Sequence, residues 1–177
     1  LWFVGDFASY HASVISITQK TAKVFQQIGL DFGILYEAER NAGNDVRRVG
    51  EEGLFEMLME KNISTLSKCT YNAIVTTDPH SYNTLKNEYS LNTNGYHRVL
   101  HYTELLDQLI GSGQLKFEKK LNYRVTYHDP CYLGRYNNVC EAPRRIIAAT
   151  GCHLIEMPHH RERTFCCGAG GGRIWME

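Results

Sequence analysis

Apolar and polar positions follow two regular patterns along this chain, one typical of short strands and the other of amphipathic helices. Short apolar runs between polar or glycine residues predict strands at 1–5, 32–36, 71–77, 97–100, 123–127 and 152–156. Apolar residues that recur every three or four positions predict helices at 11–28, 46–68, 79–89, 102–110 and 142–149. Because strands that alternate with helices are typical of β-α-β units with parallel sheets, the pattern predicts the α/β class.

Local signals mark the ends of two predicted helices. Gly29 follows the helix at 11–28, at the position where glycine often ends a helix. Asp78 and Pro79 precede the helix at 79–89, and an aspartate cap followed by proline is a strong start signal. If Asp78 is this cap, its carboxylate should accept hydrogen bonds from backbone N–H groups near Ser81.

One spacing occurs twice in the chain, once with cysteines and once without them. Cys131 is followed 35 residues later by Cys166, and Asp6 is followed 35 residues later by Asn41. The cysteine pair lies 125 residues after the pair formed by Asp6 and Asn41. A glycine stands two residues after both Asn41 and Cys166. A constant offset of this kind predicts an internal repeat.

The repeat predicts two pseudo-symmetric βαβ-type halves with parallel sheets, residues 1–120 and residues 121–177. Asp6, Asp78 and Cys131 each follow a predicted strand. Parallel α/β folds place their sites at the C-terminal ends of the strands. We therefore expect these residues to lie at such sites.

Composition and charge exclude several classes of function. Nineteen basic residues balance nineteen acidic ones, so a nucleic acid partner or an anionic membrane surface is not indicated. No apolar stretch approaches the roughly 18 residues of a membrane-spanning helix. The six cysteines include an adjacent pair, and the chain is large and lacks a secretory signal, so a reducing, cytoplasmic setting is expected rather than a disulfide scaffold.

The adjacent cysteines point to metal chemistry. Cys166 and Cys167 precede five small residues at 168–172. Thiolates hold iron–sulfur clusters, and a backbone without Cβ atoms can fold tightly and direct its N–H groups at sulfur. Three cysteines and one further ligand would also form a closed tetrahedral zinc site, so zinc remains an alternative. Arg173 stands where a dinucleotide-binding loop would need its third glycine.

The motifs around these cysteines resemble a known family over essentially the whole chain. Residues 128–136 read HDPCYLGRY, and residues 165–173 read FCCGAGGGR. Both are similar to the cysteine-rich CCG domain of the B and D subunits of heterodisulfide reductase. The same domain occurs in iron–sulfur subunits of glycolate, lactate and glycerol-3-phosphate oxidising systems. Each repeat of that family carries one cysteine, then Cys-Cys-Gly, then Cys-x-x-Cys, and these cysteines hold four-iron clusters.

The resemblance implies a ligand set in the second half of the chain. Cys131, Cys166 and Cys167 match the family's first three cysteines. The half at 121–177 is then truncated before its Cys-x-x-Cys, which would follow residue 177. An intact cluster is therefore not expected in these 177 residues alone.

In the first half the family's cysteine positions carry small polar residues, namely Asp6, Asn41, Asp78 and Ser81. Oxygen ligands suit an all-thiolate cluster poorly, so no ordinary cluster is expected there. Three interpretations remain open. The positions are polar remnants, with Asp78 as a helix cap, or Asp6, Asp78 and His80 form an altered site that binds a divalent metal or catalyses. The third is a cluster held partly by carboxylate.

The resemblance implies an iron–sulfur redox domain that transfers electrons or reduces a disulfide within a larger oxidoreductase such as heterodisulfide reductase. Its expected partners are other redox subunits or a ferredoxin-like module of the same protein, and residues 1–177 alone are expected to be inactive. The alternatives are a non-catalytic subunit-assembly domain and a zinc-binding module. The expected location is cytoplasmic, with any membrane association made through other parts of the complex.

Overall fold

The computed structural model describes residues 1–89 and 98–176. The chain divides into two compact units. Unit 1 contains residues 1–101 together with the C-terminal segment from Gly168, and unit 2 contains Tyr102–Cys167. Each unit has a parallel sheet of its own.

The sheet of unit 1 has three parallel strands in the order β1-β2-β3. These strands are β1 (Trp2–Phe3), β2 (Ala73–Thr76) and β3 (Arg98–His101). Phe3 lies opposite Thr76, and Thr76 lies opposite His101. The C-terminal ends of all three strands therefore share one edge of the sheet, and Asp6 and Asp78 follow directly beyond it.

The apolar core of unit 1 is formed by residues of both its helices and its strands. Its helices are α1 (Asp6–Tyr10), α2 (Ala12–Gln27), α3 (Asn44–Arg48), α4 (Glu52–Leu66) and α5 (Pro79–Asn83). A π-helix at Thr84–Glu88 directly follows α5, and short 3-10 helices lie at Tyr36–Ala38 and Arg173–Trp175. Phe3, Phe25 and Ile74 are completely buried, and the ring of Phe25 meets that of Trp2 edge-on at 5.3 Å between centroids. Apolar burial of this kind is the main force that holds the helices to the sheet.

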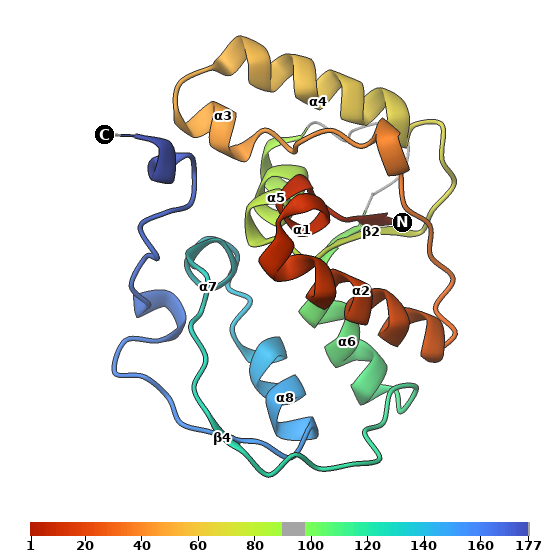
Figure 1. Ribbon diagram of the computed structural model, residues 1–177, viewed down its shortest axis with the longest axis vertical. Helices are drawn as coiled ribbons and strands as arrows, with labels where there is room; N and C mark the ends of the chain where they lie inside the picture. Colours follow the sequence, from red (N-terminus) through yellow and green to blue (C-terminus); the bar gives the residue numbers. More distant parts are fainter. Residues whose placement is uncertain (90–97, 177) are drawn as a thin grey trace. The chain divides into compact units, whose positions relative to one another are not determined.

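The predicted helix at 46–68 is two helices. Figure 1 shows α3 and α4 as separate helices joined by a turn. Gly50 stands in that turn with a φ of 95°, a backbone conformation that ends a helix and that glycine adopts without strain. The apolar periodicity continues across the break, which is why the sequence pattern alone did not reveal it.

The predicted strand at 32–36 does not form. The segment is irregular and leads into the short 3-10 helix Tyr36–Ala38. Gly33 accepts one hydrogen bond from the Trp2 backbone N–H at 2.8 Å, but no ladder follows. Tyr36 has a φ of 51°, and a left-handed residue bends the chain away from an extended course.

Unit 2 consists of α6 (Tyr102–Gly111), β4 (Arg124–Val125), α7 (Cys131–Asn137), α8 (Glu141–Ala149), β5 (His153–Leu154) and the 3-10 helix Arg161–Arg163. β4 pairs with β5 in parallel, and α6 packs against α8. Arg145 of α8 binds Asp107 of α6 with a bond of 2.7 Å from Nε to Oδ1. The sequence predicted a loop where α7 lies.

The α/β class is confirmed, because helices and small parallel sheets make up both units. The helices at 11–28, 102–110 and 142–149 form within two residues of their predicted ends. The strand predicted at 97–100 is β3, although His97 lies outside the described residues. None of the helices that the structure describes is both long enough and apolar enough to cross a membrane.

Candidate metal centre

Two cysteines that are 35 residues apart in sequence meet in unit 2. Cys131 opens α7, directly after Pro130, and its side chain shares a hydrogen bond with Cys166. Burial raises the pKa of the Cys131 thiol, and the neighbouring Cys166 and Cys167 raise it further because adjacent thiolates would repel one another. Cys131 is half-buried, whereas Cys166 and Cys167 are exposed.

A buried ion pair anchors the loop before Cys131. Asp129 is 1% exposed, and the Arg144 guanidinium donates to both of its carboxylate oxygens, at 2.7 and 2.8 Å. The backbone N–H of Arg161 donates to the same carboxylate at 2.7 Å. Burial alone would raise the pKa of Asp129, but the hydrogen bonds from Arg144 and Arg161 hold that pKa below its usual range.

The Arg144 guanidinium also reaches the segment after β5. Its Nε and Nη2 atoms donate to Glu156 at 2.6 and 2.9 Å. One side chain of α8 thereby joins the Cys131 loop to the segment that leads toward Cys166. Removal of one partner from a buried ion pair costs about 3–5 kcal/mol, because the other charge is then left buried without compensation. Arg144 therefore fixes how these two segments are placed relative to each other.

Asp6, Asn41, Asp78 and Ser81, together called the first site below, are the polar residues that the sequence predicted at the family's cysteine positions in the first half. Asn41 Nδ2 donates to Asp6 Oδ2 at 2.7 Å, so the pair at Asp6 and Asn41 touches as the pair at Cys131 and Cys166 does. Asn41 Oδ1 accepts a bond of 2.6 Å from the Gly43 backbone N–H. Both side chains are therefore held by hydrogen bonds within the first site.

Asp78 is the cap of α5, as the sequence predicted. Its carboxylate accepts bonds from the backbone N–H groups of His80 and Ser81, at 3.2 and 2.7 Å, and from the Ser81 hydroxyl at 2.7 Å. His80 Nδ1 lies 3.3 Å from Asp78 Oδ1. Burial would raise the pKa of Asp78, but its hydrogen bonds and the proximity of His80 hold that pKa below its usual value.

Glu39 supports the first site, although no motif or spacing in the sequence singled it out. Its two carboxylate oxygens accept bonds from the backbone N–H groups of Val4, at 3.0 Å, and Gly5, at 2.7 Å. Burial raises the pKa of Glu39 despite these bonds. A Cβ atom at Gly5 would lie 3.8 Å from Ser81 Oγ and 4.0 Å from Asp78 Cβ, so the chain before Asp6 lies against the start of α5.

The donor types differ between the two sites. Cys131, Cys166 and Cys167 are soft thiol donors, which fit an iron–sulfur cluster in kind and supply part of its ligand shell. In the first site the Asp78 oxygens already serve the helix cap. Across residues 1–89 and 98–176, no three His, Cys, Asp or Glu side chains are grouped closely enough to hold a metal ion by themselves.

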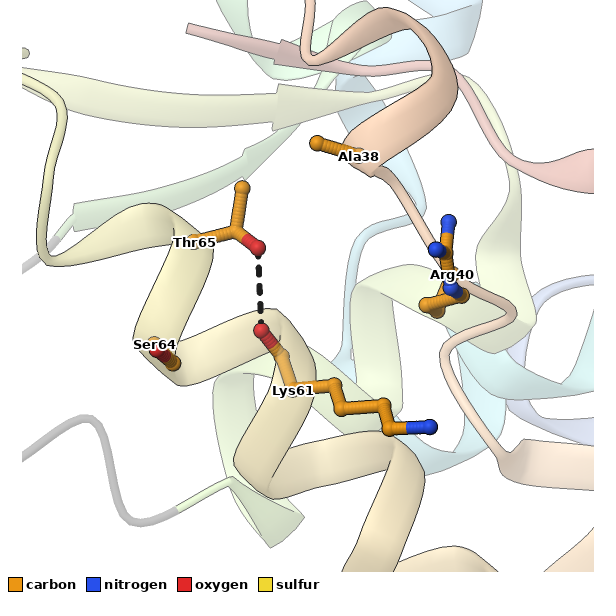
Figure 2. A pocket seen from close by; sticks show the side chains of 5 residues that line it. All are labelled: Ala38, Arg40, Lys61, Ser64 and Thr65. Carbon is orange, nitrogen blue, oxygen red and sulfur yellow. Dashed lines mark hydrogen bonds between the residues drawn. The ribbon is translucent and has the colours of Figure 1, made fainter.

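A shallow pocket lies elsewhere in unit 1 and was not predicted. Figure 2 shows its five lining residues, which are Ala38, Arg40, Lys61, Ser64 and Thr65. Thr65 Oγ1 donates to the Lys61 carbonyl at 3.0 Å, and Arg40 Nη1 donates to the Glu39 carbonyl at 3.0 Å. None of the five lining residues is a cysteine, so the pocket offers no thiolate ligand.

The sequence of this chain matches the model of a known protein family. The sequence model of the CCG cysteine-rich domain matches residues 8–86 and 125–177. The chain belongs to the CCG family of cysteine-rich domains. The two matched segments contain Asn41, Asp78, Cys131, Cys166 and Cys167, whereas Asp6 lies just before the first segment.

Three curated proteins are similar to this chain in sequence. The chain is 45% identical over its whole length to the probable iron-sulfur-binding oxidoreductase FadF of Bacillus subtilis, and 46% identical over 85% of its length to a probable membrane-anchored ferredoxin of Chromohalobacter salexigens. It is 30% identical over 97% of its length to a subunit of the dihydromethanophenazine:CoB--CoM heterodisulfide reductase of Methanosarcina barkeri.

The chain spans only part of each relative: 25% of the first, 23% of the second and 43% of the third. No solved structure matches it.

Proposed function

We propose that this chain is an iron–sulfur redox domain of a larger oxidoreductase, with Cys131, Cys166 and Cys167 as thiolate ligands of a four-iron cluster. The observation that carries this proposal is the contact between Cys131 and Cys166 across 35 residues, with Cys167 beside them. When bound, such a cluster supplies electron transfer. The protein's part is to present the thiols from a loop held by the Asp129–Arg144 ion pair.

The remaining ligands would come from a Cys-x-x-Cys pair in a longer protein. The six cysteines of these 177 residues include no such pair. The names of the relatives support an iron–sulfur oxidoreductase, and their greater length supports a chain that works with further modules. We propose that its partners are redox subunits or a ferredoxin-like module of the same protein, in the cytoplasm or beside the membrane.

We also propose that residues 1–120 and 121–177 are two repeats of one pseudo-symmetric unit, and that the first no longer holds an ordinary cluster. The separate family matches at 8–86 and 125–177 support this division. The Asp6–Asn41 hydrogen bond supports it as well, because it stands at the same spacing as the cysteine contact. The hydrogen bonds of Asp78 favour a polar remnant over a divalent metal bound by Asp6, Asp78 and His80.

Anaerobic purification of the full-length protein tests the cluster. We expect a brown protein with about four irons per cluster and matching sulfide. Serine substitution of Cys131, Cys166 or Cys167 should lower the iron content by about four atoms per protein, whereas Cys152→Ser, which changes a cysteine outside the cluster motif, should leave the iron content unchanged. Residues 1–177 alone should hold no stable cluster, because their ligand shell is incomplete. A colourless protein with stoichiometric zinc, or iron unchanged in the Cys131→Ser variant, would contradict the proposal.

A further inference from the structure

The segment that delivers Cys166 has little regular structure of its own. Between β5 and Cys166 its only described helix is the 3-10 turn Arg161–Arg163, and Thr164 and Phe165 have no regular secondary structure. A segment without a backbone ladder must be placed by contacts from elsewhere. The bond of 2.7 Å from the Arg161 backbone N–H to Asp129 holds this segment five residues before Cys166.

Two side chains from the neighbourhood of Cys131 hold the rest of this segment. His128 Nε2 lies 2.8 Å from the carbonyl oxygen of Phe165, a separation at which the protonated Nε2 donates the bond. Arg135 Nε donates to the Glu162 carbonyl at 3.1 Å, and its Nη2 donates to the Thr164 carbonyl. His128 lies three residues before Cys131, and Arg135 lies four residues after it. Together they bind three of the four backbone carbonyls that precede Cys166.

The hydrogen bond from His128 to the Phe165 carbonyl restrains the backbone next to Cys166. The carbonyl of Phe165 and the N–H of Cys166 belong to one planar peptide, so holding the oxygen also sets the direction in which the Cys166 backbone leaves it. His128 and Arg135 are themselves exposed, unlike the buried Asp129 and Arg144. Exposed side chains can be removed at little cost to a fold whose core they do not fill.

From these contacts we propose that His128 and Arg135 are positioning residues, which hold the Cys166 thiol against Cys131 before any cluster is present. The proposal rests on the function proposed above, where these thiols are cluster ligands. It adds that the ligand geometry is pre-set by side-chain bonds to backbone carbonyls. Pre-organisation of this kind lowers the entropy lost when the ligands close around a bound group.

Thiol cross-linking in the full-length, reduced, metal-free protein tests the positioning directly. A short bifunctional thiol reagent should bridge Cys131 and Cys166, and mass spectrometry identifies the bridged peptides. We expect His128→Leu and Arg135→Met each to slow this bridge several-fold, and the double variant to slow it by about tenfold, because the thiols lose effective concentration. His128→Gln, which keeps an N–H donor, should restore much of the rate.

Arg163→Gln is the matched control. Arg163 is an exposed cation of the same segment whose side chain makes none of these carbonyl bonds, so its loss should leave the bridging rate unchanged. A second measurement follows the midpoint potential of the iron-loaded protein, which should shift in Arg135→Met but not in Arg163→Gln.

An unchanged bridging rate in the double variant would refute the positioning role. A fall that follows loss of folding, seen by circular dichroism and unrelieved in His128→Gln, would refute it equally. Because the cross-link needs no iron, failure of the positioning role is separable from failure of the cluster proposal, which the iron content of the wild-type protein decides.

Discussion

The Asp78 carboxylate accepts hydrogen bonds from the first turn of α5, at a position where the family resemblance predicts a cysteine. The Ser81 N–H and hydroxyl both donate to it at 2.7 Å, and the His80 N–H donates at 3.2 Å. An aspartate cap is stabilising without any bound metal. The structure therefore supplies a structural reason for an oxygen side chain at this position.

Substitution of Asp78 distinguishes its role as a helix cap from a role as a metal ligand. We expect Asp78→Ala to lower the free energy of unfolding by about 0.5–2 kcal/mol, the usual cost of a lost helix cap. Asp78→Asn, which keeps a capping oxygen, should lose less. Urea titration measures the change, and elemental analysis should find the same metal content in all three proteins. Metal that disappears with Asp78→Ala while stability is preserved would establish the first half as a working metal site.

At the scale of elements, the glycine-rich segment after Cys167 packs against two helices of unit 1. A Cβ atom at Gly170 would lie 2.2 Å from His80 Nε2, and one at Gly172 would lie 2.6 Å from a Val49 methyl carbon. The sequence predicted that these glycines allow tight folding near sulfur. The structure gives them a further reason, since side chains there would collide with α5 and with the end of α3.

Gly170→Ala should destabilise the protein by roughly 1–3 kcal/mol, because the added methyl overpacks the contact with His80. His80→Ala should remove most of that penalty, so the two substitutions should couple in a double-mutant cycle. Gly33→Ala is the control, since a Cβ at Gly33 meets nothing within 4 Å. Additive effects of Gly170→Ala and His80→Ala in thermal unfolding would show that the contact does not restrict this position.

At the scale of the whole molecule, buried ionisable groups make stability depend on pH. His101 is 3% exposed and donates from Nε2 to the Thr77 carbonyl at 3.2 Å. Burial lowers its pKa to about 4, from an ordinary value of 6.5. The unfolded chain therefore binds a proton that the folded chain excludes, and stability is lost as the pH falls from about 6.5 to about 4.

The loss of stability in acid should thus begin at a pH well above the pH range in which carboxylates titrate. We expect His101 to account for about 3 kcal/mol of lost stability between pH 6.5 and pH 4. The lowered pKa values of Asp78 and Asp129 extend the loss to lower pH, because those carboxylates stabilise the fold only while ionised. Urea midpoints measured across this range should fall steeply for the wild-type protein and much less for His101→Gln. Equal slopes for the two proteins would contradict the assignment to His101.

Local signals in the sequence determined the α/β class, the helix at 11–28 and the cap at Asp78, because each depends on residues within a few positions of one another. The spacing of the cysteines and their motifs determined the family, which the match to CCG domains confirms. These features are encoded along the chain and can be read without knowledge of packing.

Only the tertiary structure decided how distant segments meet. The helix α7 has only seven residues, one of them the glycine Gly134, and so short a run shows no helical periodicity. Gly134 packs closely against the Arg161 backbone, where a Cβ atom would lie 3.0 Å from the carbonyl oxygen. The bonds from His128 and Arg135 to the segment before Cys166 span 27 to 37 residues, as does the Asp6–Asn41 contact at 35. Such pairings depend on how whole elements pack, a property that no local pattern records.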